Sequence, residues 1–391
     1  MAKRPTIFIA GAGGIGRALA LLLRNEPSTA AEVVLGDLRT DAAESAAAFA
    51  NADVPTDAPD ARGITMEASG ATDGLAALLD GADAIVDCLP GSEAPRMARL
   101  ALEHGCHYLN LTEYVAETNE IKGIAEGADT AFALQCGLAP GYINILGNAL
   151  VQRATKAWGV AALDKLEMRV GALTRHATEP HMYGWTWSPV GVATEYVKDA
   201  ICVRNGETVE VPSLSERRLL MLHGRPLEEA MTSGGAADLP DALAGKVRDL
   251  DYKTLRYPGH YAWVEGLLRA IPEGPDRPKK LQEAMEAVIP HVEDDLVIVY
   301  AAVEGKDASG ALRAMREVIH APSLDVQGRR LRAIESTTAC GVAEVLRMVL
   351  AGGTAAASPY KGTLLQSQIP AEEYLAGPFV GLAYRDEVPS T

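Results

Sequence analysis

The sequence predicts an α/β protein with an N-terminal doubly wound parallel sheet and a C-terminal α+β domain. Its 391 residues exceed the usual span of one hydrophobic core, so two domains are expected. In residues 1–141 short apolar runs alternate with helical patterns, which is typical of βαβ units. Near Tyr142 this alternation stops, and residues 142–336 are therefore expected to form the second domain.

The expected strands of the first domain are short and are separated by helices. Apolar residues recur at helical spacing after the first strand, and further helices are expected near 75–79 and 92–104. The run at 84–88 is apolar throughout, as a strand requires when helices cover both faces of its sheet. The strands expected here are residues 6–10, 33–36, 64–67, 84–88, 108–111 and 131–134.

The second domain is expected to combine another sheet with long helices and hairpins. A helix of about a dozen residues begins near Tyr142. Asn205-Gly206 predicts a tight hairpin, because both turn positions favour positive φ. Residues 213–250 contain several Gly and Pro breaks and are expected to form helices joined by loops. The strands expected here are residues 165–173, 200–204, 207–211, 252–257, 296–303 and 315–320.

Near the C-terminus a helix is expected to begin at Thr337 and Thr338, whose hydroxyls can cap it, and to run to about Ala351 before Gly352-Gly353. Residues 366–391 contain Pro and Gly and are expected to be irregular.

Net charge, apolar runs and cysteine content restrict the classes of partner and the cellular setting that are expected. A net charge of −16 with no basic stripe argues against nucleic acid. No apolar run is long enough to cross a membrane, and the N-terminal apolar stretch contains Arg17 and glycines, which argues against a signal peptide. Scattered cysteines, odd in number, favour a reduced cytoplasmic setting; they are Cys88, Cys106, Cys136, Cys202 and Cys340. No metal site is expected, since the spacing of His176 and His181 matches no recognised ligand pattern.

A glycine-rich turn follows the first expected strand. The residues at 11–16 fit G-x-G-x-x-G and open a helix, which is the Rossmann dinucleotide fingerprint. The first glycine permits a tight turn, the second lets a pyrophosphate approach the backbone, and the third allows close packing of helix and strand. The helix N-terminus then presents N–H groups to the phosphates. The residues assigned to this contact are Gly11, Gly13, Gly14, Ile15 and Gly16.

The end of the second strand bears on the choice of dinucleotide. Asp37 lies about 20 residues after the glycines, where a carboxylate accepts hydrogen bonds from ribose hydroxyls and repels a 2′-phosphate. NAD is therefore expected as the cofactor. Arg39 leaves NADP open, because a nearby arginine can pair with that phosphate. Leu38, between them, and Leu89-Pro90 after the fourth strand are also expected to contact the dinucleotide.

Several motifs together resemble the saccharopine dehydrogenase-like family, which includes saccharopine reductases, lysine 6-dehydrogenases and carboxynorspermidine synthases. Within this group the stretch at 252–260 is most similar to lysine 6-dehydrogenase. The motifs are the fingerprint, Val86-Asp87-Cys88-Leu89-Pro90, the turn from Cys136 to Gly141, Thr186-Trp187-Ser188-Pro189 with Gly191 and Tyr196, residues 252–260, and Thr337-Thr338.

The resemblance implies a Rossmann domain, an inserted catalytic domain and a C-terminal segment, about 337–391, that returns to the first domain. It also implies oxidation of a carbon–nitrogen bond, in which an amine becomes an imine as hydride passes to the nicotinamide, and water then releases a carbonyl. It adds Gly137 to the residues expected at the dinucleotide.

This chemistry needs a cation for a substrate carboxylate and a group that moves protons. Arg175, Arg169 and Arg256 are the candidate cations. Lys253 and His260 are the candidate acid–base groups, because both residue types can titrate near neutral pH. The residues expected to bind substrate are Tyr114, Arg175, Tyr183, Trp185, Thr186 and Arg256.

The substrate is expected to be a small amine, in particular an amino acid, and the protein a homo-oligomer such as a dimer. A reductase of the saccharopine or carboxynorspermidine type is the alternative within enzymes. A non-catalytic dinucleotide-binding sensor or assembly protein is the alternative from another class, because Rossmann folds host many roles.

Overall fold

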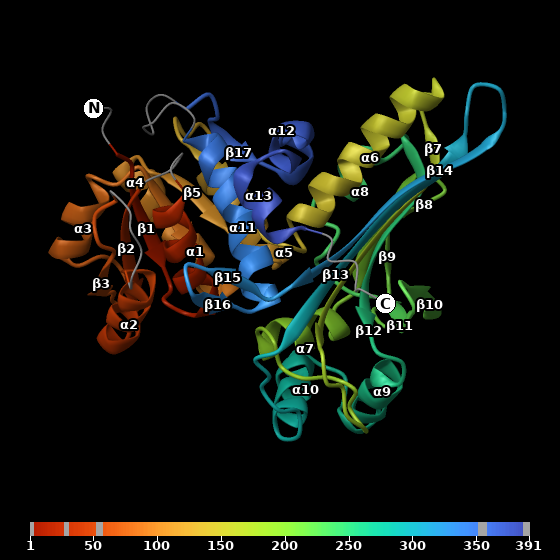
Figure 1. The fold of residues 1–391 in the computed structure, drawn as a ribbon, viewed down its shortest axis with the longest axis horizontal. Helices are drawn as coiled ribbons and strands as arrows, with labels where there is room; N and C mark the ends of the chain where they lie inside the picture. The colour runs from red at the N-terminus through yellow and green to blue at the C-terminus, as the bar shows by residue number, and fades with distance from the viewer. Residues whose placement is uncertain (1–3, 27–30, 52–57, 351–357, 386–391) are drawn as a thin grey trace. The chain divides into compact units, whose positions relative to one another are not determined.

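The computed structural model describes residues 4–26, 31–51, 58–350 and 358–385. The chain divides into two compact units, shown in Figure 1. The first comprises Met1–Tyr142, Leu324–Leu331 and Glu335–Ala383, and the second Ile143–Ser323, Arg332–Ile334 and Tyr384–Thr391.

The first unit contains a seven-stranded parallel sheet in the order β17-β6-β5-β4-β1-β2-β3. This order places β1 between β4 and β2, where the strand order reverses, and confirms the predicted doubly wound architecture. The strand β17 (Gly362–Leu364) comes from the far end of the chain and pairs in parallel with β6 (Ala131–Ala133). The other strands are β1 (Thr6–Ala10), β2 (Glu32–Asp37), β3 (Arg62–Thr65), β4 (Ala84–Asp87) and β5 (His107–Asn110).

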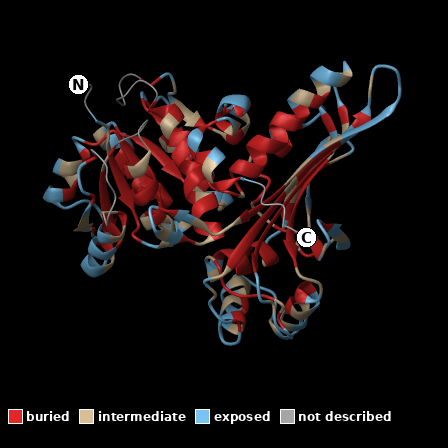
Figure 2. Ribbon diagram, in the orientation of Figure 1, coloured by how far each residue is buried: buried red, intermediate tan, exposed pale blue. Residues whose placement is uncertain are grey.

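Helices of the first unit enclose a buried aliphatic core, and Figure 2 shows the central strands as buried. The expectation of irregular chain at 366–391 is wrong for the part described, since two helices and a 3-10 turn lie there. The helices are α1 (Gly14–Asn25), α2 (Thr40–Asn51), α3 (Asp73–Leu79), α4 (Ala94–His104), α5 (Val115–Ile124), α11 (Ala333–Val349), α12 (Ala371–Leu375) and α13 (Pro378–Ala383), with 3-10 turns at Gly91–Glu93 and Gln366–Gln368.

The helix α11 begins at Ala333, earlier than its sequence predicts. The carboxylate of Asp295 accepts the backbone N–H groups of Ala333 at 2.6 Å and Ile334 at 2.9 Å. A buried acid from a distant strand thus satisfies two helix-terminal donors, and the expected cap at Thr337 and Thr338 is wrong. The expected stop at Gly352-Gly353 lies outside the described residues.

The second unit is built on a mixed eight-stranded sheet in the order β10-β11-β12-β7-β13-β14, with β8 and β9 joined to it through β12. The predicted hairpin is confirmed, because Asn205 and Gly206 both have positive φ between β8 and β9. The strands are β7 (Leu163–Thr174), β8 (Ala200–Arg204), β9 (Glu207–Val211), β10 (Arg218–Leu222), β11 (Arg225–Met231), β12 (Val247–Arg256), β13 (Asp295–Lys306) and β14 (Leu312–Pro322). A separate hairpin joins β15 (Leu324–Val326) to β16 (Arg329–Leu331).

The expectation of helices across 213–250 is wrong. The segment holds β10 and β11, and only the short α8 (Leu239–Leu243) is helical. The glycine break at Gly224 is a hairpin turn with positive φ at His223 and Gly224. Glu228 and Glu229 are buried strand residues, and consecutive charges hide the apolar alternation on which a strand prediction depends.

Four longer helices pack in this unit: α6 (Tyr142–Trp158), α7 (Pro189–Val197), α9 (His260–Ala270) and α10 (Arg277–Glu286). On one face of the sheet, the ring of His223 in the β10–β11 turn lies 4.5 Å from that of His320 on β14, so the two ends of the strand order approach each other. A leucine-rich cluster is buried on this face, around Leu173, Leu227 and Leu255. In the described part of the chain no helix is long and apolar enough to cross a membrane.

Replacing the Asp295 cap tests the account of α11. Asp295→Ala removes the carboxylate that accepts two buried N–H groups, so the free energy of unfolding should fall by about 2 kcal/mol. Urea denaturation followed by circular dichroism measures this. Asp295→Asn keeps an acceptor and should lose less; equal stability of Asp295→Ala and the unmodified protein would contradict the role.

Candidate functional site

The glycine loop between β1 and α1 has the geometry expected of the fingerprint. Gly11 has φ +102° and donates its N–H to Gly36 O at 2.7 Å. A Cβ at Gly16 would lie 1.9 Å from Gly11 O, so no other residue fits there. The two glycines therefore permit the close turn from strand to helix.

Gly13 differs, because a Cβ built on it meets no atom within 4 Å and its φ of −71° suits any residue. Among the described residues nothing fills this space, and Gly13 is exposed. Gly13 is also the N-cap of α1 and offers no side-chain cap, so the first N–H groups of the helix stay available. Open space beside free donors at a helix N-terminus fits the pyrophosphate of a dinucleotide, which Gly13, Gly14 and Ile15 would hold.

Asp37 ends β2 and is held by the backbone. Its carboxylate accepts Ala12 N–H at 3.0 Å and Arg39 N–H at 3.1 Å, so the charge is oriented beside the glycine loop. Leu38 is exposed, and the exposed Arg39 guanidinium lies 3.7 Å from Asp41. An exposed pair of this kind is weak, so Arg39 can exchange its partner for a ligand phosphate.

The turns after β4 and β5 lie against each other. A Cβ at Gly91 would be 2.3 Å from Thr112 Oγ1 and 2.7 Å from the Tyr114 ring. Close contact therefore joins the 89–91 segment, with Leu89 and Pro90, to half-buried Tyr114. Both turns lie at the carboxyl edge of the sheet, where such folds bind ligands.

The turn after β6 packs on α11. A Cβ at Gly341 would lie 2.5 Å from Gly137 O, so glycine there lets the helix approach the turn. The Gly137 carbonyl also accepts Tyr142 N–H at 2.9 Å, and Gly141 has positive φ. These contacts hold Gly137 at the same edge of the sheet.

In the second unit Arg256 lies in a fully buried cluster. Its Nε donates to Tyr196 OH at 2.6 Å, its Nη1 to Leu255 O at 3.0 Å and its Nη2 to Glu195 at 2.9 Å. The guanidinium also stacks on the ring of Tyr183, with 5.0 Å to the centroid. Each of its nitrogens thus has a protein partner.

His260 continues this cluster. Its Nδ1 lies 2.7 Å from the carbonyl of His181, which only accepts, so Nδ1 carries the proton. Its Nε2 is 3.0 Å from Tyr196 OH and accepts that hydroxyl proton. Burial, with the Arg256 charge nearby, lowers the pKa of His260 to about 3, so the imidazole is neutral at ordinary pH.

Glu195 is the titratable member of the cluster. Burial raises the pKa of its carboxyl to about 7, although the Arg256 charge opposes that rise. A carboxyl that gains and loses a proton near neutral pH is suited to proton transfer.

Beside Arg256, the 183–186 segment holds three buried polar groups: Trp185 Nε1 has no hydrogen-bond partner within the described residues, and Tyr183 OH and Thr186 Oγ1 lie close to each other. Buried polar groups are rarely left unpaired. Their concentration in four residues therefore marks this segment as a candidate polar contact for a ligand or for water.

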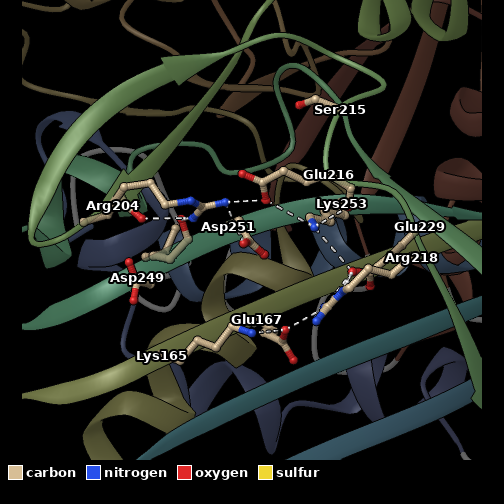
Figure 3. Close-up of polar contacts among 12 residues, drawn as sticks. Lys165, Glu167, Arg204, Ser215, Glu216, Arg218, Glu229, Asp249, Asp251 and Lys253 are labelled. Carbon is tan, nitrogen blue, oxygen red and sulfur yellow. Dashed lines mark hydrogen bonds and ion pairs between the residues drawn. The ribbon is translucent and has the colours of Figure 1, made fainter.

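Lys253 lies in a separate ionic cluster on the opposite face of β12, drawn in Figure 3. Its Nζ donates to Glu216 O at 2.9 Å and lies 3.3 Å from the Glu216 carboxylate and 3.4 Å from that of Glu229. Buried Arg169 pairs with Glu229 and Asp251, both at 2.6 Å. Strand alternation explains why Lys253 and Arg256 are not brought together.

Arg175 follows β7 and is partly exposed, with Nε 3.3 Å from Asp294. Among the described residues no group of three or more potential ligands lies close enough to hold a metal ion.

Sequence reasoning missed Glu195, Tyr196 as a bridging hydroxyl, and Asp87. Tyr196 and Asp87 stood in the recognised motifs, but their partners are distant in sequence. Glu195 lies beside Tyr196, and an acidic residue inside an apolar helix was the available signal.

Together the parallel sheet and the glycine loop define a dinucleotide-binding oxidoreductase fold. Residues 7–135 match the family described as saccharopine dehydrogenase NADP binding domain, and residues 137–381 match saccharopine dehydrogenase C-terminal domain. This chain belongs to the saccharopine dehydrogenase family, which confirms the resemblance, and its first unit is a dinucleotide-binding domain of the NADP-binding type. The closer likeness to lysine 6-dehydrogenase stays a prediction.

Two solved structures share the fold. A saccharopine dehydrogenase (L-Glu forming) from Saccharomyces cerevisiae has a TM-score of 0.68 at 14% identity, covering 95% of this chain and 97% of that one. A homospermidine synthase from Legionella pneumophila in complex with NAD has a TM-score of 0.63 at 11% identity, covering 98% and 90%.

A relative in Rattus norvegicus, mitochondrial alpha-aminoadipic semialdehyde synthase, is 25% identical over 141 residues. The match covers 36% of this chain and only 15% of that protein.

A substitution at Gly13 should change dinucleotide affinity without changing the stability of the fold. Gly13→Ala should leave the free energy of unfolding within about 0.5 kcal/mol, because its methyl group meets no neighbour. Dinucleotide affinity should fall at least about tenfold, or about 1.4 kcal/mol, because the methyl occupies the space of the pyrophosphate. Calorimetric titration with NAD and NADP measures it. Gly16→Ala is the matched control and should lose stability; unchanged affinity in Gly13→Ala would contradict the assignment.

Proposed function

We propose that this chain is an NAD(P)-dependent dehydrogenase that oxidises a carbon–nitrogen bond of a small amine or amino acid, in the manner of a lysine 6-dehydrogenase. The observation that carries the proposal is the unfilled space at Gly13 before α1, in a chain whose two matched domains both belong to the saccharopine dehydrogenase family. Oxidative deamination through an imine is the reaction class.

The reaction sets three tasks for the protein. The substrate ammonium loses a proton to a base, the carbon bearing nitrogen loses hydride, and water adds to the resulting imine so that ammonia leaves and a carbonyl remains. When bound, the nicotinamide accepts the hydride. The chain must therefore orient the amine and supply a group that holds and releases a proton.

For substrate binding we propose the 183–186 segment and Arg175 of the second unit; Tyr114 of the first unit stays a separate prediction from the sequence. Trp185 Nε1, which lacks a partner within the described residues, and the neighbouring hydroxyls of Tyr183 and Thr186 support a polar contact. Arg175 shares its Nε between half-exposed Asp294 and the carbonyl of Asp295, both at 3.3 Å, and such exposed contacts are weak enough to be exchanged for a substrate carboxylate. Each nitrogen of the Arg256 guanidinium already donates to a protein acceptor. In this proposal Arg256 therefore positions Glu195 and does not contact the substrate.

For proton transfer, Lys253 and His260 remain candidates from the sequence, and we add Glu195. Lys253 is bound by two carboxylates, and His260 has a depressed pKa that makes it a weak base. Glu195, with a pKa of about 7, is matched to the task.

An activity panel tests the reaction. The unmodified protein is offered NAD or NADP with amines and amino acids, and reduced nicotinamide is followed by its absorbance. Glu195→Gln should lower turnover about 10²–10⁴-fold if Glu195 moves the proton, with dinucleotide binding unchanged. Lys253→Met and His260→Gln are measured in parallel, and Glu265→Gln on α9 is the control, expected to keep full activity.

Full activity in Glu195→Gln, Lys253→Met and His260→Gln would end the acid–base assignment. Activity only in reverse, from an amine and a carbonyl with reduced dinucleotide, would favour the reductase alternative. Dinucleotide binding without turnover in either direction would favour a non-catalytic sensor or assembly protein.

The cofactor preference rests on Asp37. We expect NAD to bind more tightly than NADP, because the oriented carboxylate repels a 2′-phosphate. In Asp37→Ala the ratio of the NADP to the NAD dissociation constant should fall by about tenfold, equal to about 1.4 kcal/mol. Glu44→Ala, at an exposed residue of α2, serves as the matched control, and tighter NADP than NAD binding by the unmodified protein would refute the expectation.

The homo-oligomer, with a dimer as its simplest form, also remains a proposal. The edge strand β10 supports it, with Leu219 and Met221 exposed beside unpaired backbone groups. Light scattering after size-exclusion chromatography measures the assembly.

A further inference from the structure

Asp87 is a buried carboxyl at the end of β4, immediately before the turn that carries Leu89 and Pro90. It is 3% exposed, and its Oδ1 accepts Leu89 N–H at 3.0 Å. Its Oδ2 lies 2.9 Å from the hydroxyl of Tyr108 on β5. The carboxyl thus joins two neighbouring strands to the turn.

The Tyr108 hydroxyl has one proton and two acceptors. Besides Asp87 Oδ2, the carbonyl of Ala94 in the first turn of α4 lies 3.1 Å away. If Asp87 is ionised, Tyr108 can give a full hydrogen bond to only one of them. If Asp87 is protonated, Oδ2–H donates to Tyr108 and Tyr108 donates to Ala94, so both contacts are made.

Burial favours the protonated form of Asp87, and the charges around it do little to oppose this effect. Arg96 on α4 and Glu93 in the preceding 3-10 turn pair with each other at 2.8 Å, so their effects on Asp87 largely offset. The Cys88 thiol beside it is neutral, since burial raises its pKa. Asn110 lies near the Tyr108 hydroxyl and carries no charge. Within the described residues no cation forms an ion pair with Asp87.

We propose that Asp87 carries a proton in the dinucleotide-binding form of this protein and that the chain of hydrogen bonds from Asp87 through Tyr108 to Ala94 holds the 89–91 turn and the start of α4 in place. Asp87 is then a positioning residue, which acts on the dinucleotide through this turn. The assignment of the turn to the dinucleotide rests on the proposed function.

Protonation of Asp87 makes both dinucleotide affinity and folding stability depend on pH. Burial raises the pKa of Asp87 to about 7, so above that pH the proton leaves and one of the two hydrogen bonds is lost. Dinucleotide affinity should weaken about threefold to tenfold between about pH 6 and about pH 8, because the competent fraction falls. The folded protein holds this proton at pH values where the unfolded chain has lost it, so Asp87 makes folding less favourable as pH rises from about 4 to about 7.

Asp87→Asn is the decisive variant. Its amide mimics the protonated acid: Oδ1 accepts from Leu89 and Nδ2 donates to Tyr108. Its NAD affinity should match the unmodified protein near pH 6 and exceed it near pH 8, which flattens the profile. The thermal midpoint of Asp87→Asn, relative to that of the unmodified protein, should rise from about pH 4 to about pH 7. Asp83→Asn, a buried aspartate at the other end of β4, is the control and should keep the original profile.

Infrared spectroscopy of the unliganded protein reads the proton directly. The band of protonated Asp87 should be present near pH 6, diminish toward pH 8, be lost in Asp87→Asn and persist in Glu195→Gln, which removes the band of the other carboxyl with a pKa of about 7. No such band, or a profile unchanged in Asp87→Asn, would overturn the proposal. Failure of both NAD and NADP to bind at any pH would instead overturn the proposed function, while the infrared band still decides the protonation of Asp87.

Discussion

Charged side chains on both faces of β12 have to be neutralised inside the second unit, and much of its structure follows from that requirement. Asp251 and Lys253 point to one face and Arg256 to the other, and all three are buried. A buried charge that loses its partner costs about 3–5 kcal/mol, so each needs a partner held in place. The adjacent strands and α7 supply these partners, including Arg169 and Glu195.

The same requirement explains why two neighbouring glutamates on β11 have different partners. Glu229 pairs with Arg169 on one face, while Glu228 on the other face accepts the backbone N–H of Tyr261 at 2.8 Å in the first turn of α9. The cluster around Arg256 and the ionic cluster around Lys253 are thus separated by the sheet. A motif that is contiguous in sequence is divided between two environments.

Much of the fold was predictable from the sequence. The strand and glycine pattern predicted the parallel sheet and the turn at Gly11 and Gly16, because these features depend on local spacing. The alternation of 252–257 also indicated that Lys253 and Arg256 face opposite ways. It could not indicate which face holds a neutralising glutamate or a hydrogen-bonding tyrosine, because those partners come from other strands.

The parts that were missed depend on contacts between distant residues. Asp295 caps a helix that begins 38 positions later, and no motif near Ala333 reveals it. The hairpin of β10 and β11 is hidden by paired charges at Glu228 and Glu229. Similarly, Asp87 belongs to a recognised motif, but its environment depends on Tyr108 and Ala94 from the next strand and helix.

The seventh strand of the first unit has a consequence for biosynthesis. Because β17 pairs with β6, the sheet begun by the first 142 residues is completed only after Ile143–Ser323, the main part of the second unit, has been translated. During that interval the edge of β6 is open, and unpaired strand edges favour misassembly in newly made chains. The long sequence separation of this pairing also slows closure of the sheet, because loop entropy must be overcome first. Maturation of the dinucleotide-binding unit is therefore tied to the arrival of the C-terminal segment from the ribosome.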